Sequence, residues 1–237
     1  MAALQPYLLL LLRGAGITIE ISLLALVFSS AIGVVIGLLA TSGRWLYRAT
    51  RVYIELIRSI PLLVLIFFAY YAIPVVVNVN VSPYAAATAA LSIYGGAYMS
   101  EVVRSGIEAV GRNQWEAARS LGMRYPGIMA LIVLPQAIRV MIPAGIGVFI
   151  DLIKGSSVAS IIGFVELMQT AINVRNTIFS LSPIFVAGVL YFCICYILSR
   201  FGSMLELRLG TPLHAVADPA GGTAVGPAPS VESSVRS

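Results

Sequence analysis

Three stretches of this chain contain no Asp, Glu, Lys or Arg, and their lengths constrain the fold more than any other feature. They cover residues 21–43, 59–100 and 176–199. One helical crossing of a bilayer needs about 20 consecutive, mostly apolar residues. The middle stretch is long enough for two crossings, and prolines and asparagines between residues 74 and 83 divide it with turn-forming chemistry. We therefore expect an all-α, polytopic membrane protein with four spans in these stretches.

A fifth span is expected at about residues 136–154, although charged side chains divide this part of the chain. Arg139, Asp151, Lys154 and Glu166 split an otherwise apolar run into pieces shorter than a full crossing. Ionisable groups inside a bilayer are costly unless they face protein or water. We predict one crossing followed by an irregular stretch and a short helix, because irregular backbone at membrane depth must be buried in protein or line a cavity.

The distribution of arginines predicts the orientation of the five spans. Arginines concentrate in residues 44–58 and 101–130, which follow the first and third spans, whereas residues 74–83 carry no charge. Short cytoplasmic loops are enriched in Lys and Arg. The N-terminus is therefore expected outside the cell and the C-terminus in the cytoplasm. The same asymmetry accounts for the net charge of +5, so no nucleic-acid partner is predicted.

The ends of the chain are expected to lie outside the membrane-spanning domain of residues 16–208. Residues 1–15 have a short apolar run without a basic region before it, so we interpret them as an uncleaved extracytoplasmic segment rather than a secretion signal. Residues 209–237 are rich in Ala, Pro, Gly, Ser and Val without periodicity. This composition predicts a disordered cytoplasmic tail.

Residue types that bind metals or catalyse reactions are scarce in this chain. Cys193 and Cys195 are two positions apart on a predicted helix and face different directions, and His214 is the only histidine. No nucleophile–base pair of a membrane-embedded enzyme can be assembled from this inventory. A phosphate-binding glycine loop of the Walker type is also absent from the sequence. We predict that the chain is not an enzyme and holds neither a metal nor a cofactor of its own.

The charged segment from Glu101 to Pro135 differs from an ordinary loop. Its alternation of charged and small apolar residues suits two short amphipathic helices that are separated at Gly122, where glycine can adopt the left-handed conformation. Ala117, Ala118, Leu121 and Trp115 are expected to form a compact apolar face opposite a charged one. Such a face fits either a partner protein or the membrane surface.

This segment resembles the EAA motif of permeases in ATP-binding cassette (ABC) importers. The motif positions occur at the family's spacing, namely Glu116, Ala117, Ala118, Gly122, Ile132, Leu134 and Pro135. Segments Arg58–Val64, Gly96–Arg104 and Leu152–Val158 are similar to the branch that carries polar amino acids. The likeness runs from about residue 8 to 208. It departs from common members at Ser59-Ile60, where they read Gly-Thr, and at Gly155, where they read Asp.

The resemblance implies a type I transmembrane domain in the cell inner membrane that forms the translocation pathway for polar amino acids. It also implies separate cytoplasmic ATPase subunits that bind ATP and Mg, a second permease subunit, identical or related, and an extracytoplasmic substrate-binding protein. Within a coupling loop at about residues 104–135, the residues implied in coupling to the ATPase are Arg112, Trp115, Glu116, Ala117, Ala118, Gly122, Leu134 and Pro135.

Polar side chains within or beside the expected spans are the candidates for substrate binding, since their cost in a bilayer favours a functional role. They are Glu20, Asp151, Ser156, Ser157, Glu166 and Gln169, with Asn173 nearby. The excess of carboxylates over lysine favours a cationic or zwitterionic substrate. Two structural alternatives stay open: Glu20 is hydrated at the outer boundary, or Glu166 pairs with Lys154 or Arg175. An opine or other small amine is the alternative substrate, and a secondary transporter or channel is the alternative class.

Overall fold

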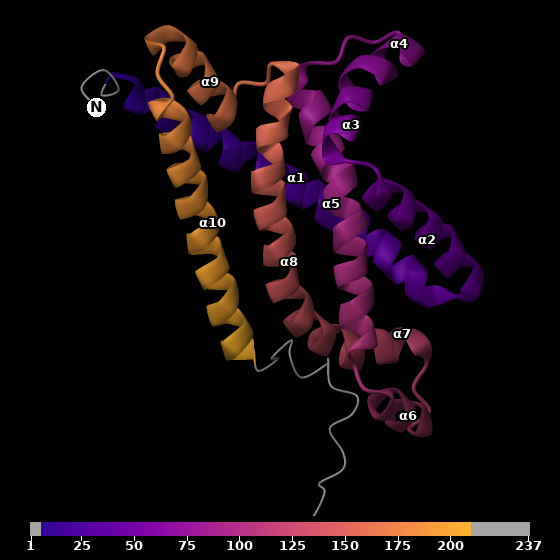
Figure 1. The fold of residues 1–237 in the computed structure, drawn as a ribbon. Helices are drawn as coiled ribbons and strands as arrows, with labels where there is room; N and C mark the ends of the chain where they lie inside the picture. Colours follow the sequence, from indigo (N-terminus) through magenta and orange to yellow (C-terminus); the bar gives the residue numbers. More distant parts are fainter. Residues whose placement is uncertain (1–5, 210–237) are drawn as a thin grey trace, which may run out of the picture.

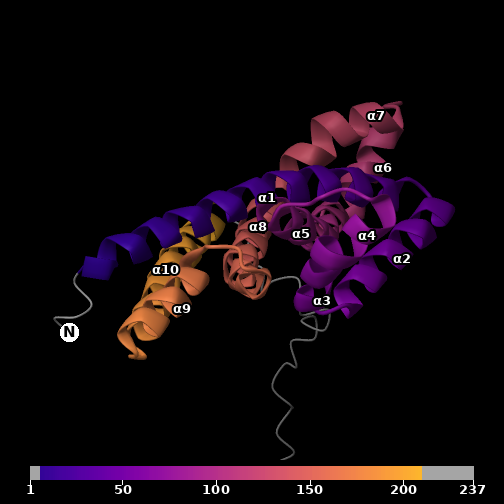
Figure 2. The same cartoon turned by 90° about the horizontal axis from the view of Figure 1, so that it is seen from above.

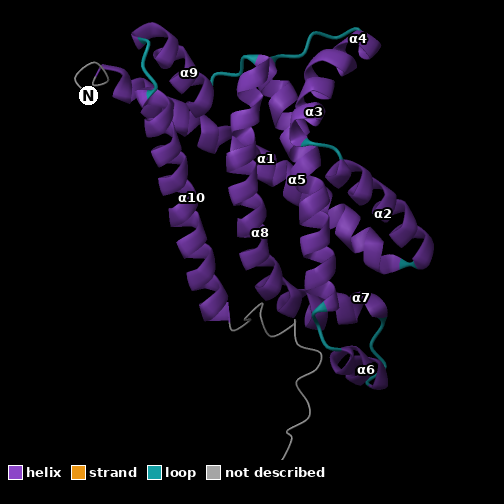
Figure 3. Ribbon diagram, viewed as in Figure 1, coloured by secondary structure: helices purple, strands orange, loops and turns teal. Residues whose placement is uncertain are grey.

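The structure is a computed structural model that describes residues 6–209. Within this range the regular elements are helices joined by short turns, and no strand occurs (Figure 3). The all-α prediction is therefore confirmed. Residues 1–5 and nearly all of the predicted tail lie outside the described residues.

The helices are compatible with the five predicted crossings, of which three are clear among residues 6–209. Three segments are individually long and apolar enough to cross a bilayer: α1 (Leu8–Ser42), the continuous helical segment Tyr125–Ile162, and α10 (Ser182–Leu209). A fourth candidate consists of α2 (Arg44–Ser59) and the helical segment after it, bent by 98° at their junction. Helix α5 (Pro83–Glu108) has 26 residues and is about 39 Å long at 1.5 Å per residue, so its length is compatible with the fifth, although it is less apolar than the other three.

Helix α1 is longer than the charge-free stretch 21–43 suggested. Its 35 residues span about 52 Å, more than the roughly 30 Å hydrocarbon core, and it runs obliquely behind α5, α8 (Leu134–Ser156) and α10 (Figure 1). Its first turns are held by packing, since Leu11 and Ala15 are buried in a cluster with Leu167 of α9 (Leu167–Ile178) and Ala187 of α10. The boundary predicted between residues 15 and 16 thus falls inside a continuous helix.

Residues 44–58, predicted as a loop, form helix α2, which buries Thr50, Ile54 and Ile57. After it come α3 (Leu62–Phe67), a π-helical turn (Phe68–Ala72) and α4 (Ile73–Val77). Pro74 explains the π-helical turn, because proline has no N–H to donate to the carbonyl four residues earlier. Another π-helical turn, Met129–Val133, precedes Pro135 between α7 (Tyr125–Ile128) and α8 for the same reason.

Small residues allow α1 and α5 to pack closely. Gly33 and Gly37 are four positions apart on α1, the spacing that lets helix backbones approach in membranes. A Cβ atom added at Gly33 would lie 2.6 Å from the Cβ of Met99, and one at Gly37 would lie 2.6 Å from the Cβ of Val103. The Ser29 hydroxyl also donates to the Ser92 carbonyl at 3.1 Å. This contact fixes α1 across one side of the molecule.

The other side of the central helices is open. Seen from above, α1 runs past α10, α8 and α5 on one side, and no helix of the described residues lies across the opposite side of α8 (Figure 2). The view in Figure 1 agrees, since α8 stands in front of α1 without another helix before it. One face of α8 is therefore available to a partner or a pathway.

The close approach of α1 and α5 predicts different outcomes for two glycine substitutions on the same helix. Gly33→Ala should destabilise the detergent-solubilised protein by about 1–3 kcal/mol, because overpacking forces the neighbours apart. Gly16→Ala is the control, since nothing lies within 4 Å of a Cβ added there. The measurement is the thermal midpoint of unfolding. Equal midpoints for both variants would contradict the packing described here.

Candidate functional site

The segment that joins α5 to α8 projects from one end of the helices (Figure 1). Residues 101–108, predicted as part of the loop, are the last turns of α5, where Arg104 bonds Glu101 at 2.7 Å and also Glu108. Helix α6 (Arg112–Ser120) follows after Gly111, and α7 begins at Tyr125. The two predicted short helices are confirmed, and the loop proper starts later than residue 104.

The turn between α6 and α7 is built on Gly122, as the sequence predicted. Gly122 has a φ of 75°, in the left-handed region that disfavours residues with a Cβ. The Met123 N–H donates to the Ala118 carbonyl at 3.2 Å, and the Gly122 N–H donates to the Arg119 carbonyl at 2.9 Å. These two bonds form a Schellman motif, which satisfies carbonyls at the end of α6. The direction of the chain after α6 is therefore fixed by a short hydrogen-bonded turn.

Helix α6 packs on α7 and the π-helical turn Met129–Val133 through only part of its predicted apolar face. Ala118 is buried in a cluster with Val103, Val133 and other apolar residues, and Trp115 packs against this cluster. The Trp115 ring stacks on Tyr125 of α7 with centroids 5.9 Å apart. The segment from α6 to α7 is thus attached to the membrane helices by a continuous apolar contact.

The remaining positions of α6 face away from the protein. Arg112, Glu116 and Ala117 are exposed, and Leu121 is 81% exposed. The prediction that Ala117 and Leu121 share a face with Ala118 and Trp115 is wrong, because the helix ends at Ser120 and Leu121 already belongs to the turn. An exposed leucine beside two exposed charges forms a mixed surface that another protein could bind.

The last two motif positions lie at the start of α8. Pro135 is exposed at the second position of α8, and the preceding Leu134 is half-buried against the cluster that holds Ala118. The motif therefore marks both ends of one rigid unit, from α6 to the first turn of α8.

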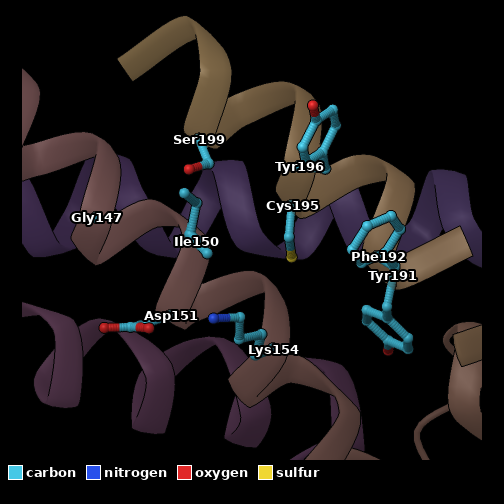
Figure 4. Close-up of a pocket in the computed structure, with 9 residues that line it drawn as sticks. All are labelled: Gly147, Ile150, Asp151, Lys154, Tyr191, Phe192, Cys195, Tyr196 and Ser199. Atoms are coloured by element: carbon cyan, nitrogen blue, oxygen red, sulfur yellow. The ribbon is translucent and has the colours of Figure 1, made fainter. Parts of the chain in front are cut away.

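A groove of about 540 Å³ lies between α8 and α10 on the open side of α8. Figure 4 shows the charged side chains Asp151 and Lys154 projecting from α8 and Tyr191, Cys195 and Tyr196 from α10. Neither charged residue belongs to an ion pair among residues 6–209, and both are exposed. Two charges of opposite sign therefore face a groove within the apolar spans. Sequence reasoning missed the α10 residues, because it could not show which helix lies opposite Asp151.

Glu166 has a different environment from the one predicted. Its side chain is 0% exposed and caps the N-terminus of α9, accepting from the Met168 and Gln169 N–H groups at 2.9 and 2.8 Å. The hydroxyls of Thr18 and Tyr191 also donate to it. The predicted alternative of an ion pair with Lys154 or Arg175 is not found among the described residues. Hydrogen bonds, rather than an ion pair, place this carboxylate among α1, α9 and α10.

The other candidate substrate residues do not gather into one site. The exposed Glu20 accepts from the Tyr84 hydroxyl at 3.3 Å, and Gln169 donates to Asn173 at 3.2 Å. Ser156 is buried, and its hydroxyl, like that of Ser157, donates to a carbonyl of the preceding turn of α8. The structure thus brings Asp151 to the groove and leaves the other five candidates elsewhere.

Residues 33–211 match the family described as the binding-protein-dependent transport system inner membrane component. The chain belongs to this family. The permease is 36% identical to the probable amino-acid ABC transporter permease YckA of Bacillus subtilis (strain 168), over 86% of this chain and 89% of that protein. It is also 36% identical to the L-cystine permease TcyB of the same organism, over 86% of this chain and 88% of that protein. The arginine permease ArtQ of this organism is 30% identical, over 88% of this chain and 96% of that protein.

Superposition on solved structures supports the same family assignment. One described as an amino acid ABC transporter with histidines superposes with a TM-score of 0.82 at 32% identity, over 87% of the permease and 97% of that chain. The MetNI methionine ABC transporter superposes with a TM-score of 0.77 at 21% identity, over 86% and 98%. The latter likeness concerns the fold alone. The predictions of an importer transmembrane domain and of a permease subunit are confirmed.

The left-handed turn predicts that Gly122→Val impairs transport more than it impairs insertion. A β-branched residue at this φ costs about 1–2 kcal/mol or more, so the turn should change conformation and α6 should change direction. Gly111→Ala is the matched control, because Gly111 has a φ of −55° and nothing lies within 4 Å of an added Cβ. ATP-driven uptake and membrane abundance are measured together. Normal uptake by Gly122→Val would contradict this role.

The cap at α9 predicts that Glu166→Gln lowers stability without changing substrate affinity. The amide cannot accept all the hydrogen bonds that the carboxylate accepts, and one donor left unpaired in a buried position costs about 1–3 kcal/mol. Unfolding in detergent and the concentration dependence of uptake are measured in parallel. A large loss of apparent affinity at normal stability would instead assign Glu166 to the substrate site.

Proposed function

We propose that this permease forms half of the translocation pathway of an ABC importer for polar amino acids, driven by cytoplasmic ATPase subunits. The observation that carries the proposal is the pair of unpaired opposite charges, Asp151 and Lys154, in a groove of a chain that is similar to amino-acid permeases. Charged groups at membrane depth are retained where they face water or a polar ligand. A zwitterionic amino acid offers both complementary charges.

The coupling role proposed for α6 follows from its attachment. Arg112 and Glu116 are exposed for polar contacts with an ATPase, while Ala117 offers little bulk and lets a partner backbone approach closely. On the inner side, Ala118 and Trp115 belong to the apolar cluster that includes residues of α5 and of the segment leading into α8. Displacement of α6 by closing ATPase subunits would move the start of α8 as a rigid body, and Asp151 lies on the same helix.

The substrate contact that we propose is between Asp151 and the ammonium group of the amino acid. The carboxylate is exposed to the groove and can form a charge-assisted hydrogen bond, which is stronger than a neutral one. Glu166 and Ser156 are buried in the protein and would support the helices around the site.

A second permease subunit is proposed to close the pathway. The groove lies on the open side of α8, and α10 presents exposed aromatic residues such as Phe185 and Phe192 beside it. A copy of this chain or a related permease, placed by a two-fold axis, would cover this side. An extracytoplasmic binding protein would deliver the substrate.

Asp151→Asn tests the substrate assignment. The complex with its ATPase is reconstituted in proteoliposomes, and uptake of labelled L-arginine, L-glutamine and L-cystine is measured. We expect at least a tenfold loss of uptake, since the amide no longer attracts an ammonium group. Glu55→Gln is the matched control, because Glu55 pairs with Arg51 on the exposed surface of α2. Undiminished uptake by Asp151→Asn would contradict the assignment, and uptake of an opine or amine alone would favour the alternative substrate class.

The proposed orientation places Asn80 outside the cell and Asn113 in the cytoplasm. Both residues are exposed, so a cysteine at either position can react. Cys193 and Cys195 are first replaced by serine, because Cys193 is exposed. An impermeant thiol reagent added to intact cells should label Asn80→Cys and leave Asn113→Cys unlabelled until the cells are opened. Equal labelling of both positions from outside would contradict the five-span orientation.

A further inference from the structure

The α10 side of the groove carries aromatic rings that have no role in the contacts proposed so far. The rings belong to Tyr191, Phe192 and Tyr196. The two charges of the groove, Asp151 and Lys154, project from α8. Figure 4 shows the Lys154 side chain extending toward Asp151, while the rings of Tyr191 and Phe192 lie on its other side. The groove therefore has a charged end and an aromatic end.

Tyr191 is held in place from outside the groove. Its hydroxyl donates to the buried Glu166 carboxylate, which also accepts from the Thr18 hydroxyl of α1 and from two N–H groups of α9. The ring is thus fixed before a ligand arrives, so that little conformational entropy is lost when one binds. Because the hydroxyl already has an acceptor, Tyr191 offers its ring to the groove.

Phe192 extends this aromatic surface. Its side chain is 66% exposed, and its ring stacks on that of Tyr196 with the centroids 5.7 Å and the planes 18° apart. Among the described residues that line the groove, Asp151 is the only one with a carboxylate. A cation at the aromatic end would therefore meet ring faces, which carry negative charge density and attract cations.

The volume and the charges of the groove indicate what the aromatic end can select. About 540 Å³ lies within the roughly 300–1,000 Å³ of small-molecule sites, so a side chain has room beside the α-ammonium and α-carboxylate groups. Asp151 and Lys154 complement those two groups in every amino acid and do not distinguish side chains. A neutral polar side chain against the rings would lose hydrogen bonds to water. A guanidinium is weakly hydrated and stacks on aromatic faces.

We propose that Tyr191 and Phe192 bind the side chain of the transported amino acid and that this side chain is cationic. The inference rests on the proposed function and deepens it, because it narrows the polar amino acids to the basic ones. The ammonium group lies at Asp151 and the side-chain cation lies against the two rings. Tyr196 supports Phe192 by stacking.

The test compares L-arginine with L-citrulline, which has nearly the same shape but a neutral side chain. Equilibrium binding of both labelled compounds, and of L-glutamine, is measured on the complete transporter in nanodiscs without its binding protein. The wild type should bind arginine at least fivefold more tightly than citrulline. Phe192→Leu should weaken arginine binding about three- to tenfold, the range of one cation–π contact, and leave citrulline within twofold.

Three further variants separate the rings from general packing. Tyr191→Leu should cause the same selective loss of arginine binding, together with lower stability, since Glu166 loses a donor. Phe192→Tyr keeps a ring and should keep the wild-type ratio of arginine to citrulline affinity. Phe185→Leu is the matched control, because Phe185 is an exposed aromatic residue of α10 that does not line the groove.

Equal affinity of the wild type for arginine and citrulline would overturn the inference and leave the proposed function standing. An unchanged ratio in both Phe192→Leu and Tyr191→Leu would also overturn it, including the case in which these variants only weaken assembly with the second permease. Failure of the wild type to bind arginine, citrulline and glutamine would instead overturn the proposed function itself.

Discussion

The cost of placing a charge in lipid is the constraint on which this structure depends. Asp151 and Lys154 face the groove between α8 and α10, while Glu166 is buried and hydrogen-bonded. The close contact of α1 with α5 at Gly33 and Gly37 holds the long helix across the other side of the molecule. Packing of small residues thus fixes the position of α1, and the groove lies on the side of α8 that α1 leaves open.

The segment of α6 and α7 projects from one end of the long helices (Figure 1). A glycine turn and a buried alanine attach α6 rigidly to the start of α8, while its charges stay exposed. The groove residue Asp151 is on the same helix, about four and a half turns further along. Under the proposed function, a movement of α6 would therefore reach the groove through one continuous helix.

The features that sequence reasoning predicted are those that local chemistry determines. Charge-free stretches located the spans, because the exclusion of charge from lipid acts on each residue separately, and the left-handed turn at Gly122 follows from its lack of a Cβ. The environment of Glu166 was not predictable, since its donors Thr18 and Tyr191 are far away in the sequence. The groove opposite Asp151 was missed for the same reason, and the early start of α1 depends on its packing against α9.

The most direct measurement of the central claim is a cysteine scan of two surfaces in the assembled transporter, starting from a variant without Cys193 and Cys195. Cysteines at Gly147 and Ile150 report on the groove, and cysteines at Val27 and Val35 report on the exposed side of α1. If the open side of α8 is the pathway, a water-soluble thiol reagent labels the groove positions, a transported amino acid slows that labelling, and the α1 positions stay unlabelled. Labelling of the α1 positions without labelling of the groove positions would show that the pathway lies elsewhere.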